Sequence, residues 1–299
     1  MITKTVIPAA GFGTRMLPAA KAVPKELLPI LDRPTIQYVV EEAAAAGIDD
    51  VLLITGRDKR ALEDHFDRNA ELEQRLAAGR KSGLLDSITA LMARVTVHAV
   101  RQGEQKGLGH AVLQARRHVG NHPFLCQLGD AIFSAPLGNP DSALGTNPPL
   151  LPAQQLVAAY RELRTPIVGL ERVAPDRVDR YGIVGGDEIA PGLLKLNTLV
   201  EKPSREAAPS NYAICARYLL TPDIFDCLDQ TPPGKGGEIQ LTDAIKLLLD
   251  RTPIHGVLLQ AARHDIGNPT DWLKTNLLYA SRDPELWQQI APLLRQLLG

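Results

Sequence analysis

Cysteine is scarce in this sequence of 299 residues, in which Cys126, Cys215 and Cys227 are the only three. Their number is odd, they lie far apart, and none belongs to a cluster with the spacing of metal ligands. A disulfide framework and a thiolate metal site are therefore excluded as organising features. We expect three reduced thiols that serve as packing residues, as is usual in the cytoplasm.

Long hydrophobic runs and a large net charge are also missing. No apolar stretch approaches the ~18 residues that a membrane-spanning helix needs, and Met1–Val6 lacks the apolar core of a signal peptide. The formal net charge is -1 at pH 7, so bulk electrostatics favour neither nucleic acid nor a membrane as a partner. We expect a cytoplasmic protein in which a few local cations bind any phosphate ligand.

Short apolar runs alternate with helical patterns along most of the chain. The predicted strands are residues 5–7, 51–54, 95–100, 124–128, 166–170, 181–186, 193–200, 213–219 and 254–259. The predicted helices are residues 35–46, 60–80, 110–118, 238–249, 271–280 and 284–298. This alternation predicts an α/β fold with a Rossmann-like mixed, mostly parallel sheet flanked by helices. Without an internal repeat or a separating linker, residues 1–299 are predicted to form a single domain.

Two segments have their own character. Residues 134–153 are rich in Pro, Gly, Asn and Ser, which predicts a long surface loop. Residues 284–298 carry apolar side chains at helical spacing, which predicts a C-terminal helix that packs on this chain or forms an oligomer contact.

Glycines and cations gather in residues 8–29, behind the first predicted strand. The loop Gly11–Arg15 is followed by Lys25, and glycines let backbone N–H groups approach phosphate oxygens while cations neutralise the remaining charge. The loop fits the dinucleotide fingerprint G-x-G-x-x-G only in part, because Met16 replaces the third glycine and no helical pattern follows at once. The segment therefore favours a polyphosphate over a nicotinamide cofactor.

Three loops follow predicted strands directly: Gly11–Arg15, Gly107–His110 and Gly129–Asp130. Ligands of open parallel sheets bind beyond the carboxyl ends of the strands. We therefore expect these loops to converge on one crevice.

Several motifs together resemble those of the sugar-1-phosphate nucleotidyltransferase family, and more narrowly of its bacterial UTP–glucose-1-phosphate uridylyltransferase branch. The segments that carry the resemblance are Gly11–Pro18, Pro24–Pro29, Arg101–Gln102, Lys106–Ala111, Glu201–Pro203, Pro209–Ala213, Thr231–Gly234 and Gly237–Ile245. They cover nearly the whole chain. The resemblance implies a nucleotide-diphospho-sugar transferase fold, a homo-oligomer (dimer or tetramer), and Mg²⁺-assisted transfer of UMP from UTP to α-D-glucose 1-phosphate, with release of pyrophosphate.

The same resemblance implies which residues act. In-line attack on the α-phosphorus crowds anionic groups together, so catalysis depends mainly on positioning and charge neutralisation. Arg15 would reach the β- and γ-phosphates, Lys25 would bridge the triphosphate and the incoming phosphate, and Lys202 would hold the sugar phosphate. Mg²⁺ prefers hard oxygen ligands, and Asp130 and Asp265 would supply them.

The remaining implied residues bind the nucleotide and the sugar. Gln102 would hydrogen-bond the pyrimidine edge, and Gly107 would contact the base through its backbone. The full nucleotide-binding set is Ala10, Gly11, Gly13, Thr14, Gln102 and Gly107, and the sugar-binding set is Gly182, Glu201 and Asn211.

Two departures from the family pattern keep alternatives open. Leu128–Ala131 reads Leu-Gly-Asp-Ala where Leu-Pro-Asp-Asp is usual, which resembles the thymidylyl branch, and Ala20 stands where the uridylyl branch usually has threonine. The alternatives are a glucose-1-phosphate thymidylyltransferase and a non-catalytic regulatory paralogue. The segment 234–245 favours the uridylyl branch. Catalysis is favoured by the intact set Thr14, Arg15, Lys25, Asp130, Lys202 and Asp265.

Overall fold

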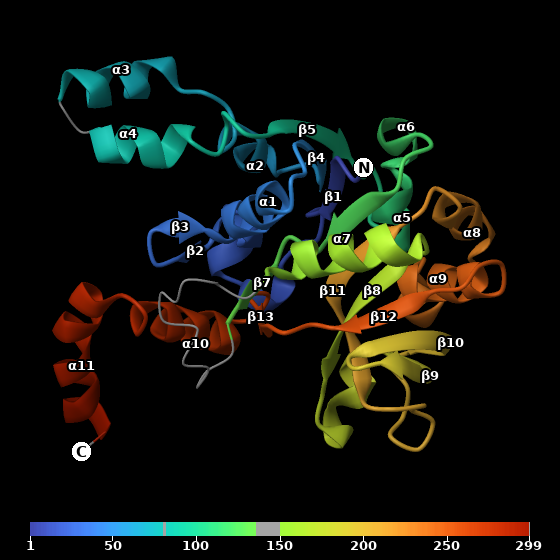
Figure 1. Ribbon diagram of the computed structural model, residues 1–299. Helices are drawn as coiled ribbons and strands as arrows, with labels where there is room; N and C mark the ends of the chain where they lie inside the picture. The colour runs from blue at the N-terminus through green and yellow to red at the C-terminus, as the bar shows by residue number, and fades with distance from the viewer. Residues whose placement is uncertain (80–81, 136–149, 299) are drawn as a thin grey trace.

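A nine-stranded sheet forms the centre of the computed structural model, which describes residues 1–79, 82–135 and 150–298 (Figure 1). In spatial order its strands are β5 (Thr96–Arg101), β4 (Asp50–Thr55), β1 (Lys4–Pro8), β6 (Phe124–Gln127), β11 (Tyr212–Leu220), β8 (Ile167–Arg172), β12 (His255–Leu258), β10 (Leu193–Glu201) and β9 (Gly182–Ala190). The run β5–β4–β1–β6 and the pair β8–β12 are parallel, and the other neighbours are antiparallel. The predicted α/β fold with a mixed sheet is confirmed, and parallel pairing dominates the half around β1.

Helices cover both faces of this sheet, which explains why its central strands β1 and β4 are almost entirely buried. Val6 and Leu52 pack into the core beneath α5 (Leu108–Leu113), α8 (Ile224–Gln230) and α9 (Leu241–Leu249). Ile7 and Leu53 point to the opposite face, which α1 (Thr35–Ala45) covers. The three cysteines are buried and form no disulfide, and burial raises the pKa of Cys126 to about 12.

The helix predicted over residues 60–80 is wrong as a single element. It consists of α2 (Arg60–Asp64) and α3 (Ala70–Ala78), because the Asn69 side chain accepts a hydrogen bond of 3.0 Å from the Leu72 N–H and starts a new helix. In Figure 1, α3 and α4 (Ser82–Thr89) project together from the body. The helix predicted over residues 110–118 is likewise divided into α5 and α6 (Arg116–Val119).

Regular structure also occurs at both ends of the predicted loop 134–153. Ser134 ends β7 (Ala131–Ser134), and Pro152 begins α7 (Pro152–Leu163), a helix that the composition does not reveal. Proline suits the first position of a helix, where its missing N–H has no partner to lose. Residues 136–149 lie outside the described residues. The strand β13 (Ala262–Asp265), which pairs with β7 in a separate two-stranded sheet, is also absent from the sequence prediction.

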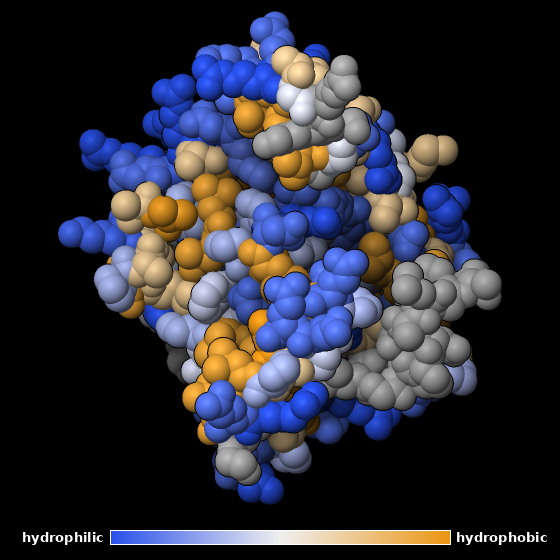
Figure 2. Space-filling view, turned by 90° about the vertical axis from the view of Figure 1, so that its left-hand side faces the viewer, coloured by the Kyte–Doolittle hydropathy of each residue, from blue (hydrophilic) through white to orange (hydrophobic). Residues whose placement is uncertain are grey.

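The C-terminal helices α10 (Pro269–Ala280) and α11 (Pro284–Leu298) follow, and the bounds predicted for the last helix are confirmed. Figure 2 shows hydrophobic residues scattered among hydrophilic ones on the side toward which α11 projects. Short elements complete the described chain: η1 (Thr14–Met16), η2 (Ala19–Lys21), η3 (Lys25–Leu27), β2 (Pro29–Ile30), β3 (Arg33–Pro34), η5 (Pro175–Arg180) and η6 (Lys235–Gly237). Within the described ranges, no helix has the length and apolar character needed to cross a membrane.

Candidate active site

The loops after β1, β5 and β6 meet at the carboxyl ends of these strands, as the sequence predicts. A cavity of about 400 Å³, here called the first cavity, lies between them. Six of the sequence-predicted residues line it: Ala10, Gly11, Lys25, Gln102, Gly107 and Asp130. Gly13 and Thr14 do not line this cavity. Gly13 shapes the loop instead, because it has a φ of 66° and a Cβ there would lie 3.3 Å from the Cβ of Lys25.

The Gln102 side chain is held in a defined orientation. Its Nε2 donates to the Gly107 carbonyl at 3.1 Å and to Nδ1 of His110 at 2.9 Å. Both amide hydrogens are thus used within the protein, which leaves the carbonyl oxygen Oε1 to accept a hydrogen bond from a ligand. His110, which is predicted to be structural, holds the Gln102 amide through this contact.

Gly107 occupies a backbone position that only glycine suits. Its φ is 97°, and a Cβ built on it would lie 2.7 Å from the Cβ of Glu238 and 2.8 Å from the carbonyl oxygen of Ile239. The Ile239 N–H also donates to the Lys106 carbonyl at 2.8 Å. The segment before α9 therefore packs directly against the loop that contains Lys106 and Gly107.

Lys25 and Asp130 form an ion pair inside the first cavity. Burial alone lowers the pKa of the Lys25 ammonium, but the Asp130 and Glu26 carboxylates raise it above its usual value. For Asp130, burial alone would raise the pKa of the carboxyl group. The Lys25 ammonium more than offsets this effect and holds the pKa of Asp130 below its usual value. Both groups are charged at neutral pH.

A second ion pair, which the sequence does not predict, joins Lys59 to Glu26, the neighbour of Lys25 in the chain. Glu26 is 1 % exposed, and Nζ of the buried Lys59 lies 2.8 and 3.1 Å from its two carboxylate oxygens. Burial raises the pKa of Glu26 and lowers that of Lys59. Glu26 could have been suspected from the sequence, because it directly follows Lys25 within residues 8–29. Nothing in the sequence indicated Lys59.

Asp130 and Asp265 come together through the β7–β13 pair. Asp265 lies opposite Ala131, and a Cβ built on Gly267 would lie 2.9 Å from Oδ1 of Asp265 and 3.3 Å from Oδ2 of Asp130. Nη1 of Arg15 is 3.7 Å from Oδ2 of Asp265. Two carboxylates and Nη2 of Arg15, at 2.7 Å, thus lie close to this one position. Carboxylate oxygens are the ligands that a hard divalent cation prefers, so the chemistry of these residues fits such an ion.

The predicted sugar-side residues are brought together only in part. Gly182 and Glu201 are partners in the β9–β10 ladder, and a Cβ on Gly182 would lie 3.2 Å from Oε2 of Glu201. Nζ of Lys202 lies 3.2 Å from Oε1 of Glu201. Asn211 is exposed, and its amide donates to the Val173 carbonyl at 3.4 Å, so it does not join the group.

Comparisons with known proteins agree with this architecture. Residues 4–282 match the family described as Nucleotidyl transferase. The chain is 45 % identical over 296 residues to UTP--glucose-1-phosphate uridylyltransferase 1 of Staphylococcus saprophyticus, covering 99 % of each chain.

Solved structures give the same result. The chain resembles a UTP-bound UGPase from Acinetobacter baumannii, with a TM-score of 0.87 and 37 % identity over 99 % of this chain and 100 % of the other. It also resembles a UDP-glucose pyrophosphorylase complexed with UDP-glucose, with a TM-score of 0.84 and 38 % identity over 94 % of this chain and 100 % of the other. The fold, the convergent loops and these likenesses show that the chain belongs to the nucleotidyl transferase family.

Proposed function

We propose that this chain transfers UMP from UTP to α-D-glucose 1-phosphate and releases pyrophosphate. A phosphate oxygen of the sugar phosphate forms a bond to the α-phosphorus of UTP, and the bond from that phosphorus to the bridging oxygen breaks in line. Pyrophosphate leaves with the electron pair of the broken bond, so the step needs no oxidant and no proton shuttle. The names of the similar proteins support this reaction.

The observation that carries the proposal is the composition of the first cavity. Gln102 lines the same cavity as the ion-paired Lys25 and Asp130. A uracil N3–H can donate to Oε1 of Gln102 while the phosphates extend toward Lys25. One cavity thus serves both the base and the charged part of one nucleotide.

Two cations are proposed to act on the phosphates. Lys25 lines the first cavity and would bridge the triphosphate and the incoming phosphate. The Arg15 side chain is 62 % exposed, so its guanidinium can move onto the β- and γ-phosphates and offer two parallel hydrogen bonds.

We propose Mg²⁺ as the divalent ion of the site, held by Asp130 and Asp265. When bound, it would neutralise phosphate charge and polarise a phosphoryl oxygen. Lys25 pairs with Asp130 and holds the pKa of that carboxyl below its usual value, and Nη1 of Arg15 lies 3.7 Å from Oδ2 of Asp265.

The sugar is assigned to the β9–β10 side. Glu201 can accept hydrogen bonds from glucose hydroxyls, Gly182 leaves space beside it, and Lys202 would bind the phosphate. A charged acceptor of this kind discriminates strongly against a sugar that lacks the matching hydroxyl. Asn211 stays a weaker part of the proposal, because its amide contacts a backbone carbonyl away from Glu201.

We also propose that α11 takes part in a homo-oligomer. Leu293 and Leu297 are 55 % and 72 % exposed on this projecting helix (Figure 1). Exposed leucines at helical spacing are suited to packing on a second copy. Light scattering after size-exclusion chromatography should give a lower mass for Leu293→Ser/Leu297→Ser than for the unaltered chain. An unchanged mass would assign no such role to the helix.

The reaction is tested with a matrix of nucleotides and sugar phosphates. Purified protein with Mg²⁺ is given UTP or dTTP together with glucose 1-phosphate or its galactose and mannose counterparts, and pyrophosphate release is measured. We expect the pair UTP and glucose 1-phosphate to react fastest. Equal or reversed preference for dTTP would place the chain in the thymidylyl branch, and no release with any pair would favour the non-catalytic alternative.

A further inference from the structure

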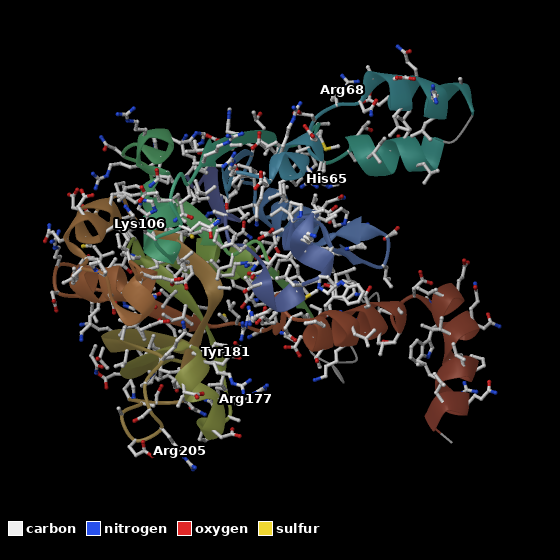
Figure 3. The ribbon with its side chains drawn as sticks, turned by 180° about the vertical axis from the view of Figure 1, so that it is seen from behind. His65, Arg68, Lys106, Arg177, Tyr181 and Arg205 are labelled. Carbon is white, nitrogen blue, oxygen red and sulfur yellow. The ribbon has the colours of Figure 1, made fainter. Side chains whose placement is uncertain are left out.

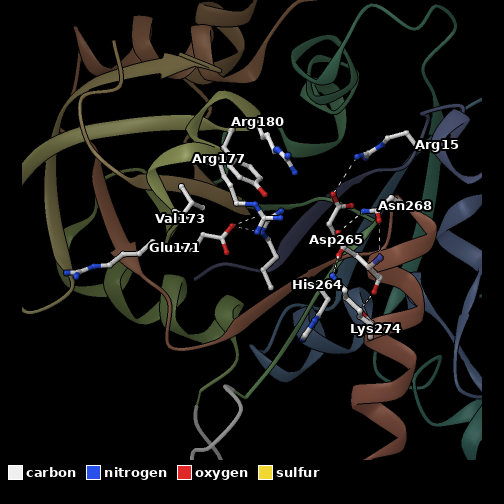
Figure 4. Close-up of a pocket in the computed structure, with 15 residues that line it drawn as sticks. Arg15, Glu171, Val173, Arg177, Arg180, His264, Asp265, Asn268 and Lys274 are labelled. Atoms are coloured by element: carbon white, nitrogen blue, oxygen red, sulfur yellow. Dashed lines mark hydrogen bonds and ion pairs between the residues drawn. The ribbon is translucent and has the colours of Figure 1, made fainter. Parts of the chain in front are cut away.

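A second cavity, of about 470 Å³, lies beside the first cavity. It shares Arg15 and Asp265 with the candidate reaction site. Figure 4 shows Arg177 and Arg180 of η5 projecting toward it from one side, with Arg15, Asp265 and Lys274 on the other. None of the residues implied by the family resemblance, apart from Arg15 and Asp265, lines this cavity.

The cavity carries more positive than negative charge. Its lining has six cationic side chains (Arg15, Arg172, Arg177, Arg180, Arg263 and Lys274) against three carboxylates (Glu171, Asp265 and Asp271). Three positive charges are therefore left uncompensated, a field suited to a polyanion.

The pairing of these groups shows which cations remain available. Each carboxylate already has a partner: Glu171 lies 2.6 Å from Arg263, Asp265 3.7 Å from Arg15, and Asp271 3.8 Å from Lys274.

The other three arginines have no carboxylate within 4.0 Å among the residues that the structure describes. Arg172 donates to the hydroxyl of Tyr212 at 3.0 Å and lies over its ring. Arg177 and Arg180 are left as the guanidinium groups most free to bind a ligand.

The lining also indicates what kind of anion fits. Gly182 and Glu201, the residues assigned to the glucose hydroxyls, lie outside it, and its character is polar and cationic. Guanidinium groups bind phosphate oxygens through two parallel hydrogen bonds, so several of them together match a phosphate chain without a sugar.

We propose that this cavity binds the leaving pyrophosphate after the bond to the α-phosphorus has broken, with Arg177 and Arg180 as its main donors. The proposal rests on the proposed function. Arg15 lines the second cavity and lies 3.7 Å from Asp265 of the candidate reaction site, so it would accompany the leaving phosphates into the second cavity. Arg177 and Arg180 thereby acquire a role that is separate from holding UTP before the reaction.

The test compares Arg177→Gln/Arg180→Gln with Arg205→Gln. Arg205 is exposed, lies at the outer end of the same lobe in Figure 3, and does not line the cavity. Sodium pyrophosphate alone is titrated into each protein in a calorimeter, and KM is measured for pyrophosphate in the reverse reaction and for glucose 1-phosphate in the forward reaction.

We expect the double variant to weaken pyrophosphate binding and raise its KM by about tenfold or more, as for lost charge-assisted hydrogen bonds. The KM for glucose 1-phosphate should change less than twofold, and Arg205→Gln should match the unaltered protein. Unchanged pyrophosphate affinity, or a rise confined to the KM for glucose 1-phosphate, would overturn the proposal. Because calorimetry needs no turnover, it decides the matter even if the unaltered protein forms no UDP-glucose. Circular dichroism verifies that the variants are folded.

Discussion

The backbone N–H of Ile266 donates a hydrogen bond of 2.8 Å to the carbonyl of Asp130. This bond and the β7–β13 ladder hold the chain around Asp265 against the chain around Asp130. Two carboxylates that are far apart in the sequence therefore occupy one small region, and the proposed Mg²⁺ site depends on this proximity.

Removal of either carboxylate charge should abolish most activity while the fold is kept. We expect Asp130→Asn and Asp265→Asn each to lower kcat about 10²–10³-fold, as for the loss of an electrostatic group aimed at the transition state. The Mg²⁺ concentration at half-maximal rate should also rise. Initial rates over a Mg²⁺ titration measure both effects. Asp187→Asn, on the exposed part of β9, is the control, and a shift of equal size there would contradict the assignment.

Gly107→Ala should impair both stability and nucleotide binding. With a φ of 97° and a ψ of 177°, the backbone conformation costs a side chain about 1–3 kcal/mol, and the new Cβ would clash with Glu238 and Ile239. We expect a lower free energy of unfolding in urea and a higher KM for UTP. Gly103→Ala is a matched control in the same loop, since its φ is not positive and no atom lies within 4 Å of the added Cβ. Similar behaviour of the two variants would disprove the steric explanation.

Arg217 should be essential for stability. It is fully buried, it contacts the Glu42 carboxylate at 2.7 and 3.0 Å, and it donates to the Ala131 carbonyl at 2.9 Å. Arg217→Met leaves the buried Glu42 carboxylate without its counter-ion, with only the Ala153 N–H still donating to it at 3.0 Å, so it should lower the free energy of unfolding by about 3–5 kcal/mol.

The matched control for Arg217 is Arg75→Met. Arg75 pairs with Glu71 at 2.7 Å on the exposed surface of α3, where the loss should stay below about 0.5 kcal/mol. Urea denaturation measures both variants. A small loss for Arg217→Met would mean that Glu42 finds another partner.

His264 should make the protein less stable in weak acid. It is held neutral by burial and contacts Oγ of Ser134 through Nε2 at 2.8 Å, and its pKa is lowered to about 4. Between pH 6.5 and pH 4 the unfolded chain binds a proton at this site while the folded chain does not, so the free energy of unfolding falls as the pH falls. Above pH 6.5 the contribution is fully present.

The substitution His264→Gln keeps a polar partner for Ser134 and removes the titration. Urea denaturation at several pH values should show a smaller loss of stability between pH 6.5 and pH 4 than in the unaltered protein. An identical pH dependence would rule out His264 as the cause. His65 and His255, whose pKa values burial also lowers, should account for part of the residual dependence.

The sequence by itself determined most strands of the large sheet and the kind of chemistry. Apolar runs such as Val51–Ile54, alternating with helical patterns, indicated strands buried on both faces, and Gly11, Gly13 and Gln102 lie close behind strand ends, where ligands bind. The tertiary structure decided what depends on contacts between distant segments: the β7–β13 pair that joins Asp130 to Asp265, Lys59 behind Lys25, and the arginines of the second cavity. Those relationships have no local signature, because strand pairing and charge compensation depend on which chain segments the folded sheet brings within a few ångströms of one another.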